Sequence, residues 1–270
     1  MLAATPSKQN ADPKFFHDLS VWREAKSPVN RRGDSPALLE LSPAMAAIKL
    51  VVFDIAGTII EDHGEVVSAF SGALQENGIA VSREELKPWK GVSKREVIRH
   101  FVERHLGNSP ANADKIEAIY RRFRAELESL YAESLTTIAG AASTFAWCRE
   151  HDIQIATTTG FYRELSDQIL NKTGWRELFA ANISSTDVRQ GRPAPFMIFR
   201  AMEAAGVQNV KQVINVGDTP LDLQAGGNAG VRGVVGVLTG EHKLETLQPE
   251  PHTHIIGSVA EIPALIERGY

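Results

Sequence analysis

Six short apolar runs recur along the chain, and stretches with helical patterning separate them. The runs cover residues 48–53, 153–157, 181–184, 212–216, 233–237 and 254–256. Short β-branched runs of this kind are typical of strands that are buried on both faces of a sheet. Strands that alternate with helices indicate parallel pairing. The pattern therefore predicts an α/β fold, a doubly wound, Rossmann-like parallel sheet.

The stretch between the first two runs is too long for a loop. Its residues have no strand pattern and predict helices over 66–77, 82–87, 93–106, 113–132 and 141–150. Compact domains seldom contain unstructured connections of that length. We therefore expect an α-helical cap domain over 61–137, inserted into a core formed by 45–60 and 138–270.

The first 44 residues differ from the rest of the chain. They contain five of the 13 prolines, one glycine and no sustained periodicity. Such a stretch is expected to be a poorly ordered N-terminal extension, residues 1–44. The alternative is a short amphipathic turn around residues 15–22 that docks elsewhere.

Charge and cysteine content exclude several classes of partner. Lys and Arg total 29 against 33 for Asp and Glu, which argues against a nucleic-acid or anionic-membrane surface as the main partner. Cys148 is the single cysteine, which suits a reducing compartment. No uncharged apolar run approaches the roughly 18 residues of a membrane span, and no signal-peptide pattern opens the chain. We expect a cytoplasmic protein that does not bind membranes or nucleic acid.

Polar residues follow the predicted strands at the end of the sheet where ligands bind in folds of this type. They are Asp54, then Thr158, Thr159 and Gly160, then Arg192, and finally Asp218 and Asp222. Three neighbouring carboxylates would repel one another unless a cation neutralised them. Hard oxygen ligands suit Mg²⁺, which also bridges to phosphate. The sequence therefore predicts a magnesium site that suits a phosphate-bearing ligand.

These motifs, in this order over residues 48–236, resemble the haloacid dehalogenase superfamily of hydrolases with a helical cap. The resemblance implies that Asp54 is a nucleophile that forms an aspartyl-phosphate. It also implies that Asp218, Asp54 and the backbone carbonyl of Ala56 hold Mg²⁺, with Asp222 supporting the water shell of the metal. Thr159, Gly160 and Arg192 would bind the phosphoryl oxygens, with Thr158 as the alternative if the strand ends one residue earlier.

Ala56 departs from the usual superfamily pattern, in which a second aspartate protonates the leaving group. General acid catalysis contributes roughly 10²- to 10⁴-fold, so hydrolysis of ordinary phosphate esters should be slow without this acid. A leaving group that needs no proton would explain the alanine better than an inactive copy would.

The phosphonatase branch of the superfamily uses such a leaving group, and this chain resembles it closely. The matching segments are Asp54-x-Ala56-Gly57-Thr58, Gly191-Arg192-Pro193-x-Pro195, Asn228-Ala229-Gly230 and Gly91-x-x-Lys94. The resemblance implies that Lys94 forms a Schiff base with the aldehyde of phosphonoacetaldehyde, and that Gly91 belongs to the substrate-binding loop. It also implies a homodimer that pairs through the caps.

Two other interpretations of Lys94 stay open: a phosphate or sugar contact, and a solvated charge on an exposed helix face. A lysine is nucleophilic only when neutral, so Schiff-base chemistry would require a desolvating cap. Val97, Phe161 and Gly64 stand where phosphonatases have histidine, tyrosine and cysteine. The aldehyde-handling part of the site is thus matched less well than the phosphoryl-transfer part.

We therefore expect a Mg²⁺-dependent hydrolase that cleaves the carbon–phosphorus bond of phosphonoacetaldehyde or a related small phosphonate. The alternative within the same superfamily is a phosphatase acting on a small phosphate monoester. The alternative from another class is a catalytically inactive module that binds a phosphorylated ligand.

Overall fold

The computed structural model describes residues 47–89 and 92–270, and Pro43–Tyr270 form one compact unit. The expected extension over residues 1–44 and the predicted substrate-binding Gly91 lie outside the described residues. Their assignments therefore stay predictions.

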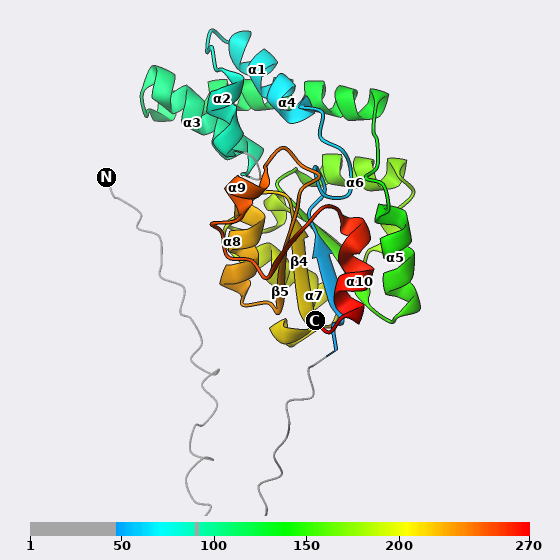
Figure 1. Ribbon diagram of the computed structural model, residues 1–270. Helices are drawn as coiled ribbons and strands as arrows, with labels where there is room; N and C mark the ends of the chain where they lie inside the picture. The colour runs from blue at the N-terminus through cyan, green and yellow to red at the C-terminus, as the bar shows by residue number, and fades with distance from the viewer. Residues whose placement is uncertain (1–46, 90–91) are drawn as a thin grey trace, which may run out of the picture. The chain divides into compact units, whose positions relative to one another are not determined.

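Six parallel strands form one sheet in the order β3-β2-β1-β4-β5-β6 (Figure 1). The strands are β1 (Leu50–Phe53), β2 (Gln154–Thr159), β3 (Ala181–Ser184), β4 (Val213–Gly217), β5 (Gly233–Val237) and β6 (His254–Ile256). The predicted doubly wound α/β sheet is confirmed. The strand order runs outward from β1 in one direction and from β4 in the other, so the topology switches between these two neighbours.

Helices cover both faces of the sheet because successive residues of each buried strand point to opposite sides. Val51 and Phe53 belong to the apolar cluster on the face of α5 (Ala141–Glu150), α6 (Arg163–Lys172) and α10 (Ile262–Glu267). Leu50 and Val52 belong to the cluster on the other face, with α7 (Phe196–Ala204), α8 (Pro220–Ala229) and α9 (Leu244–Leu247). The central strand is therefore buried on both sides.

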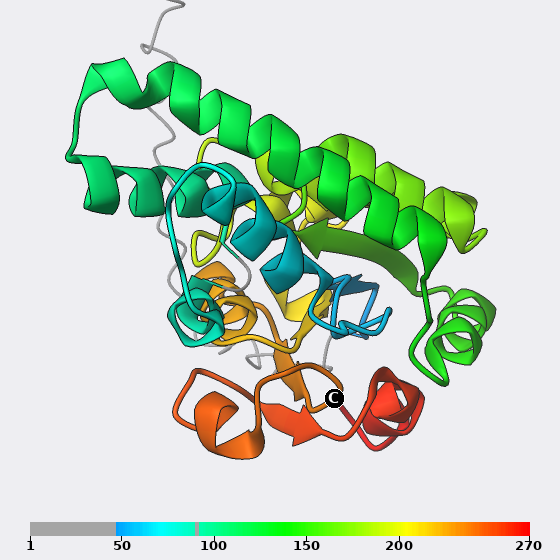
Figure 2. The same ribbon diagram turned by 90° about the horizontal axis from the view of Figure 1, so that it is seen from above.

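A group of helices fills the predicted insertion between β1 and β2. They are α1 (Glu65–Gln75), α2 (Arg83–Leu86), α3 (Lys94–Leu106) and α4 (Ala113–Glu133). Helix α4 packs along α1 and α3 (Figure 2), and the rings of Phe70 and Phe123 stack with centroids 4.3 Å apart. This is the helical cap; its boundaries at 61 and 137 as a separate domain stay predictions.

Strand β2 is longer than the sequence pattern suggested. It continues to Thr159, whereas an end at residue 157 was expected. Thr158 pairs with Ile183, and Thr159 pairs with Ser184 at the end of β3. Pairing with β3 holds these β-branched residues in the sheet, so Thr159 is the residue that ends the strand.

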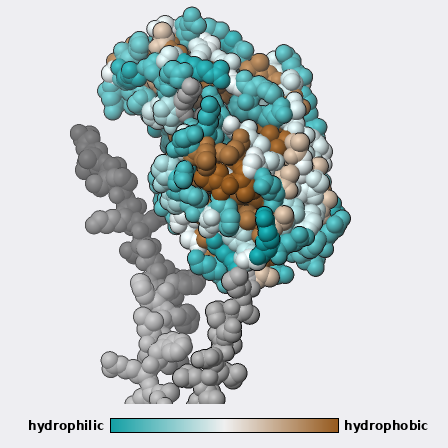
Figure 3. Space-filling view, in the orientation of Figure 1, coloured by the Kyte–Doolittle hydropathy of each residue, from teal (hydrophilic) through white to brown (hydrophobic). Residues whose placement is uncertain are grey.

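Most of the face in Figure 3 is hydrophilic, with one hydrophobic area near its centre. The large apolar side chains that remain substantially exposed among the described residues are Leu106, Phe196, Phe199, Leu238 and Leu244. No helix in the described ranges has both the length and the apolar character that a membrane crossing requires. The expected homodimer stays a prediction.

Candidate active site

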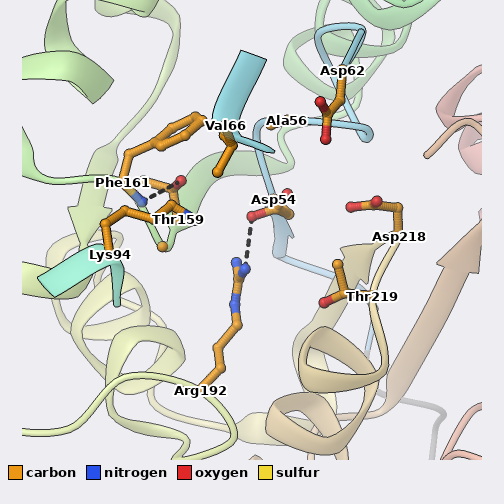
Figure 4. Close-up of a pocket in the computed structure, with 11 residues that line it drawn as sticks. Asp54, Ala56, Asp62, Val66, Lys94, Thr159, Phe161, Arg192, Asp218 and Thr219 are labelled. Carbon is orange, nitrogen blue, oxygen red and sulfur yellow. Dashed lines mark hydrogen bonds and ion pairs between the residues drawn. The ribbon is translucent and has the colours of Figure 1, made fainter. Parts of the chain in front are cut away.

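The predicted polar residues converge where the topology switches, at the carboxyl ends of β1 and β4. Asp54 follows β1 directly, and Asp218 follows β4 directly. Both line the same pocket, which has a cavity volume of about 40 Å³. The residues around it are Asp54, Ala56, Asp62, Val66, Lys94, Thr159, Gly160, Phe161, Arg192, Asp218 and Thr219 (Figure 4). Core and cap residues therefore share one cavity.

Three buried aspartates form the acidic centre of this region. Asp54, Asp218 and Asp222 each place a carboxylate oxygen within 4.8 Å of the others. The pKa of Asp54 is raised from its ordinary 3.8 to about 7, because the effects of burial and of the neighbouring Asp222 carboxylate together exceed the opposing effect of Arg192. The cluster thus concentrates negative charge that one guanidinium offsets only in part.

Arg192 connects these carboxylates to β2. One guanidinium nitrogen, Nη1, lies 2.8 Å from an oxygen of Asp54 and 2.8 Å from an oxygen of Asp222. The other, Nη2, donates hydrogen bonds to the carbonyl and the hydroxyl of Thr158, at 2.8 and 2.9 Å. Arg192 lines the pocket as expected, whereas Thr158 does not. The side chain of Thr158 therefore supports Arg192.

Asp222 is fixed by the start of α8. Its Oδ2 accepts hydrogen bonds from the backbone N–H and the hydroxyl of Thr219, at 3.1 and 2.5 Å, in a capping box. Its other oxygen pairs with Arg192. Asp222 is completely buried and does not line the pocket. Its contacts in this structure are those of a residue that positions Arg192.

The carboxylate of Asp218 packs closely against two glycines, Gly57 and Gly240. A Cβ added at Gly57 or at Gly240 would collide with its carboxylate. Gly57 also has φ +86°, a backbone conformation that glycine adopts readily. The hydroxyl of Thr58 donates to Asp218 at 3.3 Å. The carboxylates of Asp54 and Asp218, with the adjacent backbone of Ala56, form a hard-oxygen donor set that fits a divalent cation.

Lys94 enters the pocket from the cap. It is the first residue of α3, and only 6% of it is exposed. Its Nζ lies 5.4 Å from the centroid of the Phe161 ring. In Figure 4, Lys94 and Phe161 lie on one side of Asp54, and Asp62 and Asp218 lie on the other. The interpretation of Lys94 as a solvated surface charge is therefore wrong.

Thr159 and Gly160 line the pocket at the end of β2, as expected. The hydroxyl of Thr159 accepts a hydrogen bond from the backbone N–H of Phe161 at 3.1 Å, which shapes the turn. Sequence reasoning missed Asp62 as a pocket residue. Asp62 lies in the connection into the cap, and no motif marks it.

The chain matches the sequence pattern of one known protein family over most of its length. The model of the haloacid dehalogenase-like hydrolases matches residues 51–236 of the chain. The chain belongs to this family. The resemblance inferred from the motifs is thereby confirmed, and this haloacid dehalogenase-like hydrolase is an enzyme.

Curated relatives of this hydrolase include enzymes named phosphonoacetaldehyde hydrolase. The one from Bacillus cereus is 32% identical over 217 residues, which cover 75% of this chain and 80% of the relative. The one from Paraburkholderia phytofirmans is 30% identical over 224 residues, which cover 76% and 83%. The phosphonatase-like assignment agrees with these names.

Solved structures share the fold of this hydrolase. A phosphonoacetaldehyde hydrolase like protein from Oleispira antarctica has a TM-score of 0.73 at 22% identity, with 83% of this chain and 93% of that one covered. A putative beta-phosphoglucomutase from Bacteroides vulgatus has a TM-score of 0.71 at 21% identity, with 82% and 88% covered. At these identities the likeness shows the fold alone.

Proposed function

We propose that this hydrolase cleaves the carbon–phosphorus bond of phosphonoacetaldehyde or a closely related small phosphonate aldehyde. The observation that carries the proposal is the burial of the Lys94 amine in the same pocket as the Asp54 carboxylate, where residue 56 is an alanine. The site thus contains the Lys94 amine and has no acid at position 56. That exchange suits a leaving group that needs an electron sink and no proton.

In the proposed reaction, the Lys94 amine condenses with the aldehyde and releases water, which gives an iminium ion. Asp54 then attacks phosphorus, the carbon–phosphorus bond breaks, and its electron pair moves into the iminium to give an enamine. Water hydrolyses the aspartyl-phosphate to inorganic phosphate and restores Asp54. Protonation of the enamine at carbon, followed by hydrolysis, releases acetaldehyde and restores Lys94.

The other residues would bind and orient the phosphoryl group. Asp54, Asp218 and the carbonyl of Ala56 would hold Mg²⁺, which when bound stabilises negative charge on the phosphoryl oxygens. Thr159 and Gly160 would bind phosphoryl oxygens at the end of β2. We assign Arg192 to holding Asp54 in position as well as to the phosphoryl group, because it already contacts that carboxylate. Asp222 would keep Arg192 in place.

Reductive trapping tests the proposal. We expect borohydride, added with Mg²⁺ and phosphonoacetaldehyde, to leave a mass adduct on Lys94, and the untrapped reaction to release phosphate. Lys94→Arg is the matched control, because it keeps a positive charge but cannot form a Schiff base at working pH. Phosphate release from phosphonoacetaldehyde that survives in Lys94→Arg would contradict the Schiff-base mechanism and support a simple contact.

A phosphatase acting on a small phosphate monoester is the second candidate. The observation that favours it is Asp62, a carboxyl group in the same pocket that could protonate a departing alkoxide. This candidate predicts ester hydrolysis that survives in Lys94→Arg and is lost in Asp62→Asn. Asp54→Asn should abolish turnover under either candidate, so a substrate turned over only with Asp54 present excludes an inactive binding module.

A further inference from the structure

A second pocket adjoins the active-site pocket beside Lys94. Its cavity volume is about 260 Å³, against about 40 Å³ for the active-site pocket. Lys94 and Gly160 line both cavities, so these two residues form the boundary between them. In Figure 4, Lys94 lies on the side of Asp54 away from Asp218. A ligand that extends from the aspartates past Lys94 therefore enters the second pocket.

Three arginines give this second pocket, the arginine pocket, a positively charged lining. They are Arg95 on α3, Arg124 on α4 and Arg163 on α6, and Glu164 is the acidic residue among the described residues that line it. The carboxylates that pair with these arginines outside the lining are Glu117, Glu128, Asp167 and Asp187. Each guanidinium has five N–H donors, so one carboxylate partner does not exhaust it. The pocket therefore suits an anion, although the chain as a whole is negatively charged.

Arg124 is held in place at the wall of the arginine pocket. Its guanidinium carbon lies 4.0 Å from the centroid of the Tyr162 ring, and its Nη2 donates to Oε1 of Glu128 at 3.3 Å. The Tyr162 hydroxyl donates to the same oxygen at 2.8 Å. Glu164, 3.5 Å from Nη2, has a side chain that is 65% exposed, and exposed ion pairs are weak. An incoming carboxylate can therefore replace Glu164 on a guanidinium that is already oriented.

The proposed reaction places phosphorus at Asp54 and the carbonyl carbon of the substrate at Lys94. In phosphonoacetaldehyde that carbon carries only a hydrogen beyond the carbonyl group, which would leave the arginine pocket unfilled. We propose that the substrate carries a carboxylate beyond its carbonyl carbon, and that this carboxylate binds in the arginine pocket with Arg124 as its main partner. The substrate class is then the phosphono oxo acids. This inference rests on the proposed function, whose steps then release phosphate and an oxo acid in place of acetaldehyde.

Ligands without a carbonyl group test the inference without turnover. 3-Phosphonopropionate and 4-phosphonobutyrate carry a carboxylate where propylphosphonate and butylphosphonate end in a methyl group. Calorimetry with Mg²⁺ measures the four affinities in wild type, Arg124→Gln and the matched control Arg121→Gln, because Arg121 is exposed on the same helix and does not line the pocket. We expect wild type and Arg121→Gln to bind at least one carboxylate ligand about tenfold more tightly than its methyl counterpart, as for one charge-assisted hydrogen bond. Arg124→Gln should lose most of this preference and keep its affinity for the alkylphosphonates.

Arg95→Gln is a second variant, chosen because the Arg95 side chain is 49% exposed and its loss should not disturb folding. We expect it to lose a smaller part of the carboxylate preference. A wild type without that preference, or a preference that survives in both variants, overturns the inference, while Lys94 trapping by phosphonoacetaldehyde still upholds the proposed function. An equal loss of affinity for all four ligands in Arg124→Gln also overturns it, because the arginine would then act on the phosphonate group. A carboxylate preference in a wild type that forms no trapped adduct overturns the proposed function, and the substrate class with it.

Discussion

At the scale of single residues, the buried carboxylates of the site rely on Arg192 for compensating positive charge. Arg192 contacts both Asp54 and Asp222, and all three are buried. Burying a charge is unfavourable unless a partner compensates it, and removing one partner leaves the others uncompensated. The residual imbalance falls on Asp54, whose pKa is about 7 without a bound metal. A divalent cation would complete the balance.

The raised pKa of Asp54 predicts how stability varies with pH in the metal-free protein. The folded state holds the proton up to about pH 7, whereas the unfolded chain releases it near the ordinary 3.8. Stability contributed by this group therefore falls as pH rises from about 4 to about 7 and is constant above that. We expect Mg²⁺ to raise Tm more at pH 8 than at pH 6, because metal binds the deprotonated carboxylate. Calorimetry should show both effects greatly reduced in Asp54→Asn, and a Mg²⁺ response that does not change with pH would contradict the assignment.

Replacement of Arg192 should destabilise the core strongly. Arg192→Ala leaves the Asp54 and Asp222 carboxylates without their guanidinium, and loss of one partner from such a buried group costs about 3–5 kcal/mol. Arg200→Ala is the matched control, because the Arg200 side chain is 57% exposed and pairs with the exposed Glu203; exposed pairs contribute about 0–1 kcal/mol. Urea unfolding measures both variants. An equal loss of unfolding free energy in the two variants would mean that the buried ion pairs of Arg192 stabilise the fold no more than an exposed pair does.

At the scale of elements, short loops at the strand ends position the site because glycines let them approach one another. The loop after β5 reaches the loop after β1, where the hydroxyl of Thr239 donates to the carbonyl of Gly57 at 2.6 Å. Gly240 in the same loop adjoins the Asp218 carboxylate. Three separate strand ends are thus held together around one carboxylate.

Gly240→Ala should therefore displace Asp218 and weaken metal binding. The added Cβ would overlap the carboxylate, so we expect at least a tenfold loss of Mg²⁺ affinity by isothermal titration. Gly72→Ala in α1 is the matched control, since nothing lies within 4 Å of its added Cβ. That change should leave Mg²⁺ affinity unaltered and stabilise the helix by about 0.5–1 kcal/mol. Normal Mg²⁺ affinity in Gly240→Ala would exclude Asp218 as a metal ligand.

At the scale of the whole molecule, the cap provides the residues that distinguish this site from a bare aspartate cluster. Lys94 lies on the cap helix α3, and Asp62 lies on the connection into the cap; both line the pocket. Core residues alone would supply the groups of the proposed phosphoryl transfer. Closure of cap on core is what would exclude water from the proposed reaction.

At this scale we also predict the effect of removing the expected N-terminal extension, residues 1–44. Pro43–Tyr270 form a compact unit by themselves, so a chain that begins at Met45 should keep the Tm and the kcat of the full chain. Calorimetry and a phosphate-release assay on both chains check this. A lower Tm for the shorter chain would assign a structural role to residues 1–44.

The sequence by itself determined the sheet, the helical insertion and the meeting of Asp54, Asp218 and Arg192. Hydrophobic periodicity reports local burial, and parallel strands necessarily bring their carboxyl ends together. It did not place the end of β2 correctly, because pairing with β3 extends that strand to Thr159. Local patterns do not contain that contact.

Only the tertiary structure decided which neighbour each side chain meets. It placed the Thr158 side chain against Arg192, brought Asp62 into the pocket and buried Lys94. Each of these outcomes depends on side-chain direction and on packing between segments far apart in the chain. Residue type and spacing fix the periodicity of a segment, but not the atoms that another segment places against it.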